Sequence, residues 1–331
     1  MTGDGAVTSL HPLRAAWRRL ARCRPAWPAR RTRDRLALLL ALALGLGALV
    51  FLLHGVDLVA VRDAMLRQPP AQLLWALALT GASFACLALH DAVSVAVVAG
   101  RRAPLRVALL AGACGGAIAN TLGFHALSGS AVRAHLYVAA GLSGAQVARV
   151  LSLSGLALVV GNATMLAAAE LVQAGLAGHR LAHLGMGGAL AVAQLALLVW
   201  LGRAPRRIAI RRFSLPLPSA RLALVQMAIG AVESGAAVGA LYVLLPADLA
   251  PPFSLFAVGC IAAVALGVAA HTPGGIGVFE AGITALLAGR GRSDLLAALL
   301  LYRLVFNLLP FALALAALAW RAARRRRARA P

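Results

Sequence analysis

Long apolar stretches recur along the whole chain, separated by short polar segments. A helix needs about 20 predominantly apolar residues to cross about 30 Å of hydrocarbon. Stretches of comparable length lie at residues 36–53, 71–98, 147–172, 183–201, 222–245, 254–270 and 295–320. Because 61% of the residues are hydrophobic and only 13% are charged, the chain cannot cover itself with an ordinary water-exposed surface. We therefore predict an all-α, polytopic integral membrane protein with about eight transmembrane helices.

The same pattern predicts one transmembrane domain, residues 36–320, with a basic segment at either end, 1–35 and 321–331. The formal net charge is +22. All 32 basic residues are arginine, concentrated at residues 1–35, 101–106, 203–221 and 321–329. Arginine clusters that flank apolar spans mark the cytoplasmic side, and the composition is typical of a GC-rich bacterium. We expect a bacterial inner-membrane protein with both termini in the cytoplasm and no nucleic-acid partner.

The sequence indicates neither a metal site nor a cofactor site. Cys23, Cys86, Cys114 and Cys260 are scattered without CxxC spacing, which favours neither a disulfide framework nor a zinc site. No Walker motif is present, so ATP is not expected as the direct source of energy.

Two apolar stretches, residues 107–141 and 271–289, are interrupted and are predicted to be broken or re-entrant. The interruptions in the first stretch are assigned to glycines, namely Gly112, Gly115, Gly116, Gly123 and Gly129. Paired interruptions in the two halves of a chain point to the binding site of a transporter built from inverted repeats. The alternative is that glycine only permits close helix packing, as at Gly112/Gly116 and Gly235/Gly239.

All three glutamates, Glu170, Glu233 and Glu280, lie in apolar stretches. A charge at mid-bilayer costs about 2.5–3.5 kcal/mol on insertion scales, so each should be paired, protonated or exposed to a polar cavity. Glu170 lies near the end of its span and is expected to reach the interface. For the other two we predict an ion pair of Arg303 with Glu280 or with Glu233, either structural or part of a transport site.

Other polar residues in the apolar regions complete the candidate site. Asn307 follows Arg303 by one helical turn, and Pro310 is expected to kink the helix beyond it. Arg133 follows the first interruption, where it either binds a phosphate or marks the cytoplasmic side. In the second interruption, Pro273-Gly-Gly-Ile-Gly277 should stop one helix and leave N–H groups free at the start of the next, a place where an anionic headgroup can dock.

Three blocks of the sequence resemble the lysylphosphatidylglycerol synthase transmembrane-region family. HTPGGIGVFEAG at 271–282 resembles its PGG-x-G-x-FE signature, LGFHALSGSAVRAHLYVAAGLS at 122–143 its SG-x-A-x-R block, and LLYRLVFNLLPF at 300–311 its last helix. The blocks occur in the expected order, and the resemblance covers residues 36–320. It implies a flippase that moves a phospholipid or glycolipid between leaflets. Because the chain ends at Pro331 without the family's aminoacyl-transferase domain, we expect no lysyl transfer to lipid and no enzyme activity.

The residues and the resemblance together predict a cavity that binds a lipid headgroup and contains no catalytic residue. Its predicted lining is Ser128, Arg133, Tyr137, Glu233, Pro273, Gly274, Gly275, Gly277, Glu280, Arg303 and Asn307.

Two other classes of function remain open from the sequence. A membrane-embedded enzyme acting on a lipid-linked substrate would use acid/base groups drawn from His90-Asp91, His125, His271 and Glu280. A non-transporting partner of a separate lipid-synthesis enzyme would need none of these charges. Small-residue pairs also permit a homodimer.

Overall fold

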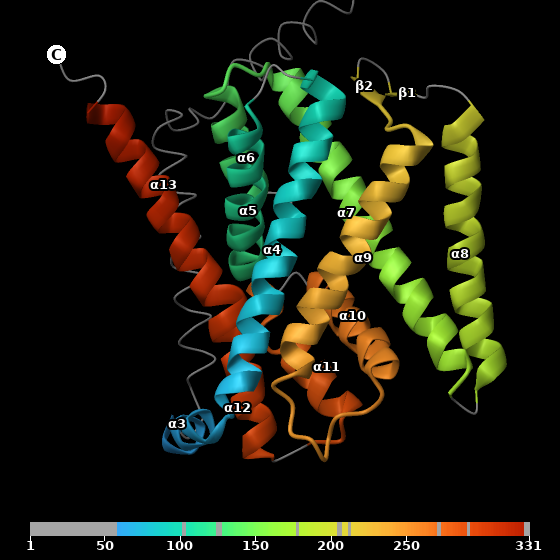
Figure 1. The fold of residues 1–331 in the computed structure, drawn as a ribbon, viewed down its shortest axis with the longest axis vertical. Helices are drawn as coiled ribbons and strands as arrows, with labels where there is room; N and C mark the ends of the chain where they lie inside the picture. Colours follow the sequence, from blue (N-terminus) through green and yellow to red (C-terminus); the bar gives the residue numbers. More distant parts are fainter. Residues whose placement is uncertain are drawn as a thin grey trace, which may run out of the picture. The chain divides into compact units, whose positions relative to one another are not determined.

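The computed structural model describes residues 58–100, 104–123, 128–176, 179–203, 207–210, 213–269, 273–289 and 292–327, which all belong to one compact unit (Figure 1). Six helices in this part of the chain are long and apolar enough to cross a membrane. The predicted all-α, polytopic membrane fold is therefore confirmed. The predicted first span, 36–53, and the basic segment 1–35 lie outside the described residues.

Four helices extend through the bundle close to the predicted spans: α4 (Pro70–Ala99), α7 (Gly144–Ala174), α8 (Arg180–Arg203) and α9 (Ala220–Tyr242). Their starts have local causes. Proline at the first position of α4 loses no helical hydrogen bond. Ser143 and Gln146 form a capping box at the start of α7, and the Ser219 hydroxyl accepts from the Leu222 N–H at the start of α9.

The last span consists of α12 (Ser293–Tyr302), a π-helical segment (Arg303–Leu308) and α13 (Leu309–Arg327). It continues past the predicted boundary at residue 320. Between the first two predicted spans lies a short helix, α3 (Leu58–Arg67). The arginine-rich segment 203–221 contains an antiparallel hairpin of β1 (Arg207–Ile210) and β2 (Phe213–Pro216).

Both predicted interruptions separate the two arms of a helical hairpin. The first hairpin pairs α5 (Leu105–Leu122) with α6 (Ser128–Val138), and the second pairs α10 (Phe253–Ala269) with α11 (Val278–Leu286). In Figure 1, α5 and α6 lie in the upper half of the bundle, where α13 finishes, and α10 and α11 lie in the lower half. Each hairpin therefore begins and ends in its own half of the bundle, as expected of a re-entrant segment, and we call both re-entrant hairpins.

The order of elements forms an inverted repeat. A long helix, a re-entrant hairpin and a second long helix occur first as α4, α5–α6 and α7, and again as α9, α10–α11 and the last span. The two series run in opposite directions through the bundle, and α8 connects them (Figure 1). This arrangement matches the predicted inverted repeat.

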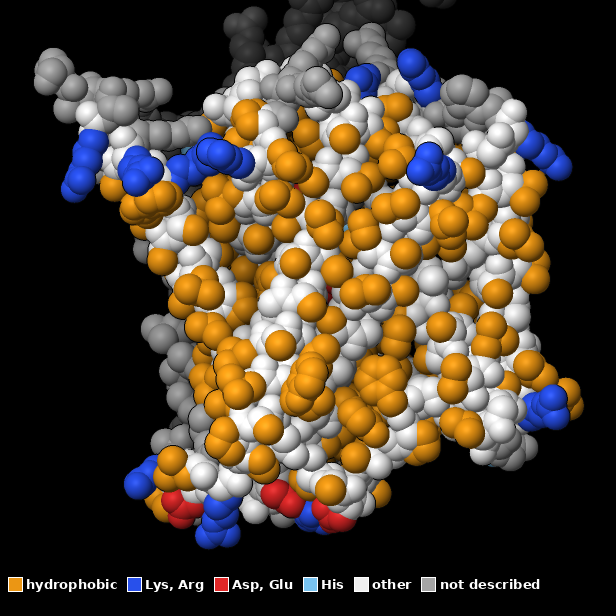
Figure 2. Space-filling view, viewed as in Figure 1, with side chains coloured by type: hydrophobic (Ala, Val, Ile, Leu, Met, Phe, Trp, Pro, Cys, Tyr) orange, Lys and Arg blue, Asp and Glu red, His pale blue; other side chains and the backbone are white. Residues whose placement is uncertain are grey.

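The surface has the distribution expected for a lipid-exposed protein. Apolar side chains fill the middle of the face in Figure 2, while arginines gather at the end where α13 finishes, which we call the arginine-rich end. Acidic side chains appear among the basic ones at the opposite end, where Arg292 pairs with Asp248 and Asp294. By the positive-inside rule, the arginine-rich end is expected to be cytoplasmic.

Most glycines of residues 107–141 pack helices rather than break them, which corrects our assignment of the interruption. Gly112, Gly115 and Gly116 lie inside α5 and Gly129 inside α6; only Gly123, with φ +68°, ends a helix. A Cβ at Gly112 would lie 2.7 Å from Cα of Ala88 in α4. The small-residue packing alternative thus holds for Gly112/Gly116.

The close crossing of α7 with α9 was not predicted. A Cβ at Gly161 of α7 would lie 2.5 Å from Cα of Gly230 in α9, so the two backbones touch without intervening side chains. The predicted pair Gly235/Gly239 has only ordinary contacts, 3.6 Å to Met165 and 3.4 Å to Leu79 for an added Cβ.

Substituting Gly161→Ala should destabilise the protein, because the new methyl group meets backbone that cannot move aside. Overpacking of this kind costs about 1–3 kcal/mol, seen as a lower midpoint of thermal unfolding in detergent. Gly155→Ala in the same helix is the matched control, because no atom lies within 4 Å of its added Cβ. Equal midpoints for the two variants would contradict the close crossing.

Candidate functional site

The tips of the two hairpins meet each other and the π-helical segment inside the bundle. The Thr121 hydroxyl of α5 lies 3.0 Å from the backbone oxygen of Asn307, and the Asn307 amide donates to the backbone oxygen of Asn120 at 3.0 Å. A Cβ at Gly274 would lie 2.7 Å from the backbone oxygen of Thr121. These contacts bring together segments about 150 to 190 residues apart in the sequence and form one polar junction.

The second tip can form only with glycines. Gly274, Gly275 and Gly277 have φ of +60°, +69° and +82°, which residues with a side chain rarely adopt. Pro273 opens this turn as a 3-10 segment and has no N–H to satisfy. The Gly277 N–H then donates to the Glu280 carboxylate at 2.7 Å and starts α11.

Of the two partners predicted for Arg303, Glu280 and Glu233, the structure pairs it with Glu280. Nε and Nη2 of Arg303 lie 2.7 and 2.6 Å from Oε1 of Glu280, and Nη1 donates to the Gly274 backbone oxygen at 2.7 Å. The guanidinium also lies over the Phe279 ring, 5.2 Å from its centroid. The Arg303–Glu280 prediction is confirmed, and the groups best suited to bind a headgroup are engaged with one another.

The irregular part of the last span lies before Pro310 rather than beyond it, which corrects the predicted kink position. The Leu309 N–H bonds back five residues to Leu304, the pattern of a π-helix, and such insertions are frequent at functional sites. Within this segment the Asn307 side-chain oxygen is buried without a hydrogen-bond partner. Asn307 is thus a buried polar residue with one unused acceptor at the junction.

A second ion pair holds the first hairpin. Nε of Arg133 in α6 lies 3.2 Å from the carboxylate of Asp91 in α4, and the Tyr137 hydroxyl donates to the same oxygen at 2.7 Å. Asp91 and Tyr137 are fully buried, whereas 16% of the Arg133 side chain is exposed. Arg133 is therefore more than a topology marker, and its terminal nitrogens bond to none of the described residues.

The glycines of α5 make room for this pair. A Cβ at Gly115 would lie 2.6 Å from Nε of Arg133, and one at Gly112 would lie 3.0 Å from Cβ of Asp91. The predicted site residue Ser128 donates to the Gly123 backbone oxygen at 2.8 Å, which closes the break between α5 and α6. Tyr137 is too deeply buried to line an open surface.

Asp91 was missing from the predicted site, although a signal was available. It is the single acidic residue in the apolar stretch 71–98, and the cost of burying a charge applies to it as it does to the glutamates. Its position next to His90 had suggested only a catalytic group.

The other two glutamates lie apart from the junction. Glu170 pairs with Nδ1 of His183 at 2.6 Å, joining α7 to α8. Glu233 in α9 is buried and contacts the hydroxyls of Ser83 and Ser234, with no cationic partner among the described residues.

The histidine and carboxylate groups of the enzyme alternative do not converge in the described part of the chain. His90 lies beside Asp91 and Arg133, while Glu280 is bonded to Arg303 and Gly277. His125 and His271 lie outside the described residues. The enzyme alternative thus stays a prediction, because its candidate groups that lie in the described residues are not brought to one site.

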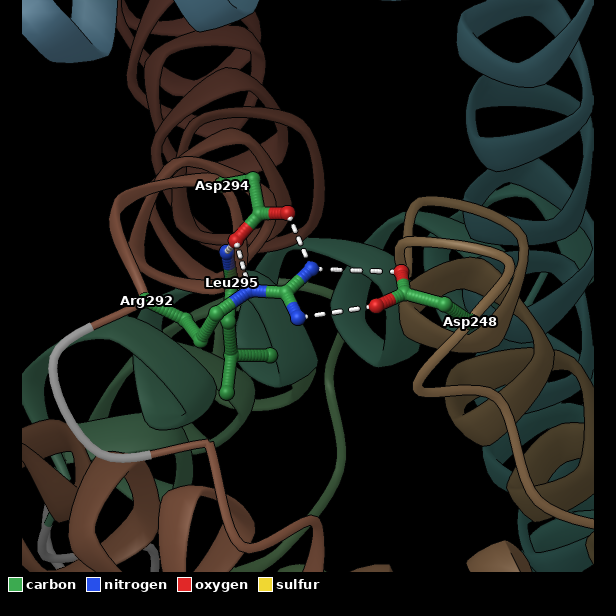
Figure 3. A network of polar contacts seen from close by, with 4 residues as sticks. All are labelled: Asp248, Arg292, Asp294 and Leu295. Atoms are coloured by element: carbon green, nitrogen blue, oxygen red, sulfur yellow. Dashed lines mark hydrogen bonds and ion pairs between the residues drawn. The ribbon is translucent and has the colours of Figure 1, made fainter.

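A third ion-pair network fastens the loops at the end opposite the arginine-rich end (Figure 3). Arg292 makes two bonds to Asp248, at 2.8 and 3.2 Å, and two to Asp294, at 2.9 and 2.6 Å. The hydrogen bonds from Arg292 hold the pKa of Asp248 below its usual range. Because this network is exposed, it serves as a reference for the buried pairs.

Breaking the Arg303–Glu280 pair should cost far more stability than breaking the exposed one. Removing one partner of a buried pair costs about 3–5 kcal/mol, because the other charge stays buried. We expect Arg303→Gln and Glu280→Gln each to lower the unfolding midpoint strongly, and the double variant to lose less than their sum. Asp248→Asn is the control and should change little. Strictly additive losses would contradict a direct pair.

Comparison with known proteins gives two relatives, and no family model matches the chain. A stretch of 112 residues is 39% identical to the inner membrane protein YbhN of Escherichia coli (strain K12), covering 33% of this chain and 35% of that protein. The chain thus matches about a third of the length of YbhN.

The second relative covers most of the chain. A stretch of 219 residues is 32% identical to the uncharacterized protein slr0712 of Synechocystis sp., covering 64% of this chain and 67% of that protein. With its helical spans and its inverted repeat, the chain is a multi-pass membrane protein and belongs to the same family as slr0712.

Proposed function

We propose that this protein is a lipid transporter that lets the polar headgroup of a phospholipid or glycolipid cross the bacterial inner membrane. The observation that carries the proposal is the junction of two re-entrant hairpins, which lie in opposite halves of the bundle and meet each other and the last span inside it (Figure 1). Broken helices that meet near the midplane between inverted repeats form the substrate sites of many transporters.

The location of the family-like blocks supports a flippase of the lysylphosphatidylglycerol synthase transmembrane-region type. The block at 271–282 supplies Gly274 and Glu280, and the block at 300–311 supplies Arg303, which binds both. The block at 122–143 supplies Arg133, the cation of the first hairpin. The segments that carry the resemblance therefore supply the whole Glu280–Arg303 pair and the cation of the Asp91–Arg133 pair.

The physical task of such a transporter is to replace water around a headgroup. A phosphate cannot cross hydrocarbon unaided, because removing its hydration costs far more than hydrophobic contacts return. Arg133 suits this task, since its terminal nitrogens bond to no described residue and a guanidinium binds phosphate bidentately. At the junction, an entering anionic headgroup would compete with Glu280 for Arg303.

The similarity to an inner membrane protein of Escherichia coli supports the proposed location. The concentration of arginine at the end where α13 finishes supports a cytoplasmic C-terminus. The arginines at the end of α13 also favour binding of anionic lipid there.

Headgroup translocation in proteoliposomes tests the proposal. Fluorescent phospholipids and glycolipids are quenched from outside by an impermeant reductant, and wild-type protein should expose the protected inner-leaflet signal. Arg133→Gln should slow this loss at least tenfold, because losing one charge-assisted contact of 1.5–3 kcal/mol typically has that effect. Asp91→Asn combined with Arg133→Gln should be equally slow while leaving no unpaired charge.

Arg292→Gln is the matched control, since it removes an arginine from an exposed ion pair outside the hairpins. It should translocate lipid like wild type. If no lipid moves faster than in empty vesicles, or if folded Arg133→Gln is as fast as wild type, the proposed function is wrong in its activity or in its site.

A further inference from the structure

Glu233 is a buried carboxyl group placed where three long helices meet. It lies in α9, one turn after Gly230, where the crossing with Gly161 brings α7 close to α9. Only 7% of the residue is exposed, and no arginine or histidine among the described residues pairs with it. An ionised carboxylate in such surroundings lacks the compensation that buried charges require.

The hydrogen bonds around Glu233 leave a place for one additional proton. The Asn162 amide nitrogen donates to the Leu158 backbone oxygen, so its side-chain oxygen is the acceptor for Ser234, at 2.7 Å. The single hydroxyl proton of Ser234 is thereby used. Oε2 of Glu233, 3.3 Å from the same hydroxyl oxygen, can then bond to it only by carrying a proton itself.

The opposite oxygen of Glu233 is already satisfied. The Ser83 hydroxyl of α4 donates to Oε1 at 3.1 Å. With a proton on Oε2, an unbroken chain runs from Ser83 through Glu233 and Ser234 to Asn162. A metal ion would need these oxygens to point at a common centre, whereas they point at one another, so the geometry favours a proton over a cation.

A second polar level lies between α4 and α9, toward the arginine-rich end. His90 and Gln226 are each seven residues from Ser83 and Glu233 on these antiparallel helices, about 10 Å away. His90 and Gln226 are almost fully buried and lie next to each other. Even so, both ring nitrogens of His90 and both side-chain amide atoms of Gln226 lack a regular hydrogen-bond partner. Buried polar atoms of this kind are commonly satisfied by ordered water.

The other titratable or charged groups near the two levels come from several helices. Glu233 faces Cys86 of α4 and Tyr302 of α12, and His90 faces Asp91 of α4 and Arg133 of α6. Asp91 and Arg133 are paired with each other, and none of the four supplies a free cation for Glu233.

We propose that Glu233 binds and releases one proton in each transport cycle, and that His90 and water connect it to the arginine-rich end. On release, the Oε2–H bond breaks, the carboxylate keeps the electron pair, and the proton passes through water to a ring nitrogen of His90. The coupling of this proton to lipid movement rests on the proposed function, whereas proton binding by Glu233 does not.

Infrared difference spectroscopy of the purified protein tests proton binding without any transport. During a pH jump, wild type should show the C=O stretching band of a protonated carboxylic acid, shifted in D₂O. Glu233→Gln should lose this band while keeping its unfolding midpoint, because the amide has the shape of the neutral acid. Asp248→Asn, which removes an exposed carboxylate, should keep the band. A band that is absent from wild type, or unchanged in Glu233→Gln, overturns the proposal.

Translocation under an imposed pH gradient tests the coupling. With one proton per lipid, a gradient of one pH unit should give up to a tenfold asymmetry of lipid between the leaflets. Glu233→Gln should abolish the asymmetry, and His90→Phe should slow its development. Lipid movement that ignores the gradient in wild type overturns the coupling. If no lipid moves at all, the proposed function fails, and the infrared band alone decides the proton site.

Discussion

The need to satisfy backbone groups inside the membrane shapes the centre of this protein. A re-entrant hairpin exposes N–H and C=O groups where lipid offers no partner. At the second tip, Arg303 donates a hydrogen bond to the Gly274 backbone oxygen, and Glu280 accepts one from the Gly277 N–H. Arg303 and Glu280 also neutralise each other's charge. The ion pair thus stabilises the backbone as well as the charges, and the hairpin, the last span and their junction all depend on it.

The two repeats solve the same problem in related ways. In each half, one ion pair fastens the second arm of a re-entrant hairpin to a long helix: Asp91 with Arg133, and Glu280 with Arg303. Glycine allows both arrangements but by different means. In α5 it provides space beside the charged side chains, and at the second tip it provides a backbone conformation. Similar sequence features therefore serve different physical purposes in the two halves.

Hydropathy alone predicted the long helices and the existence of both interruptions, because these depend only on the order of residue types along the sequence. The pairing of Arg303 with Glu280 was predictable because the sequence offers few buried charges. The crossing of Gly161 and Gly230 was not, since it depends on how two helices are rotated. Asp91 was overlooked as a site residue, and the β1–β2 hairpin was too short to stand out within an arginine-rich segment.

The two ion pairs distribute charge differently between hairpin and bundle. In the first repeat the cation, Arg133, belongs to the hairpin, and its anion remains on α4. In the second repeat the anion, Glu280, belongs to the hairpin, and Arg303 stays with the long last span. Moving the first hairpin away from the bundle would remove the positive charge of Arg133 and leave the Asp91 carboxylate unpaired. Moving the second hairpin away would leave the Arg303 guanidinium unpaired. The two sides of the molecule would thus present opposite charges to whatever enters between hairpin and bundle.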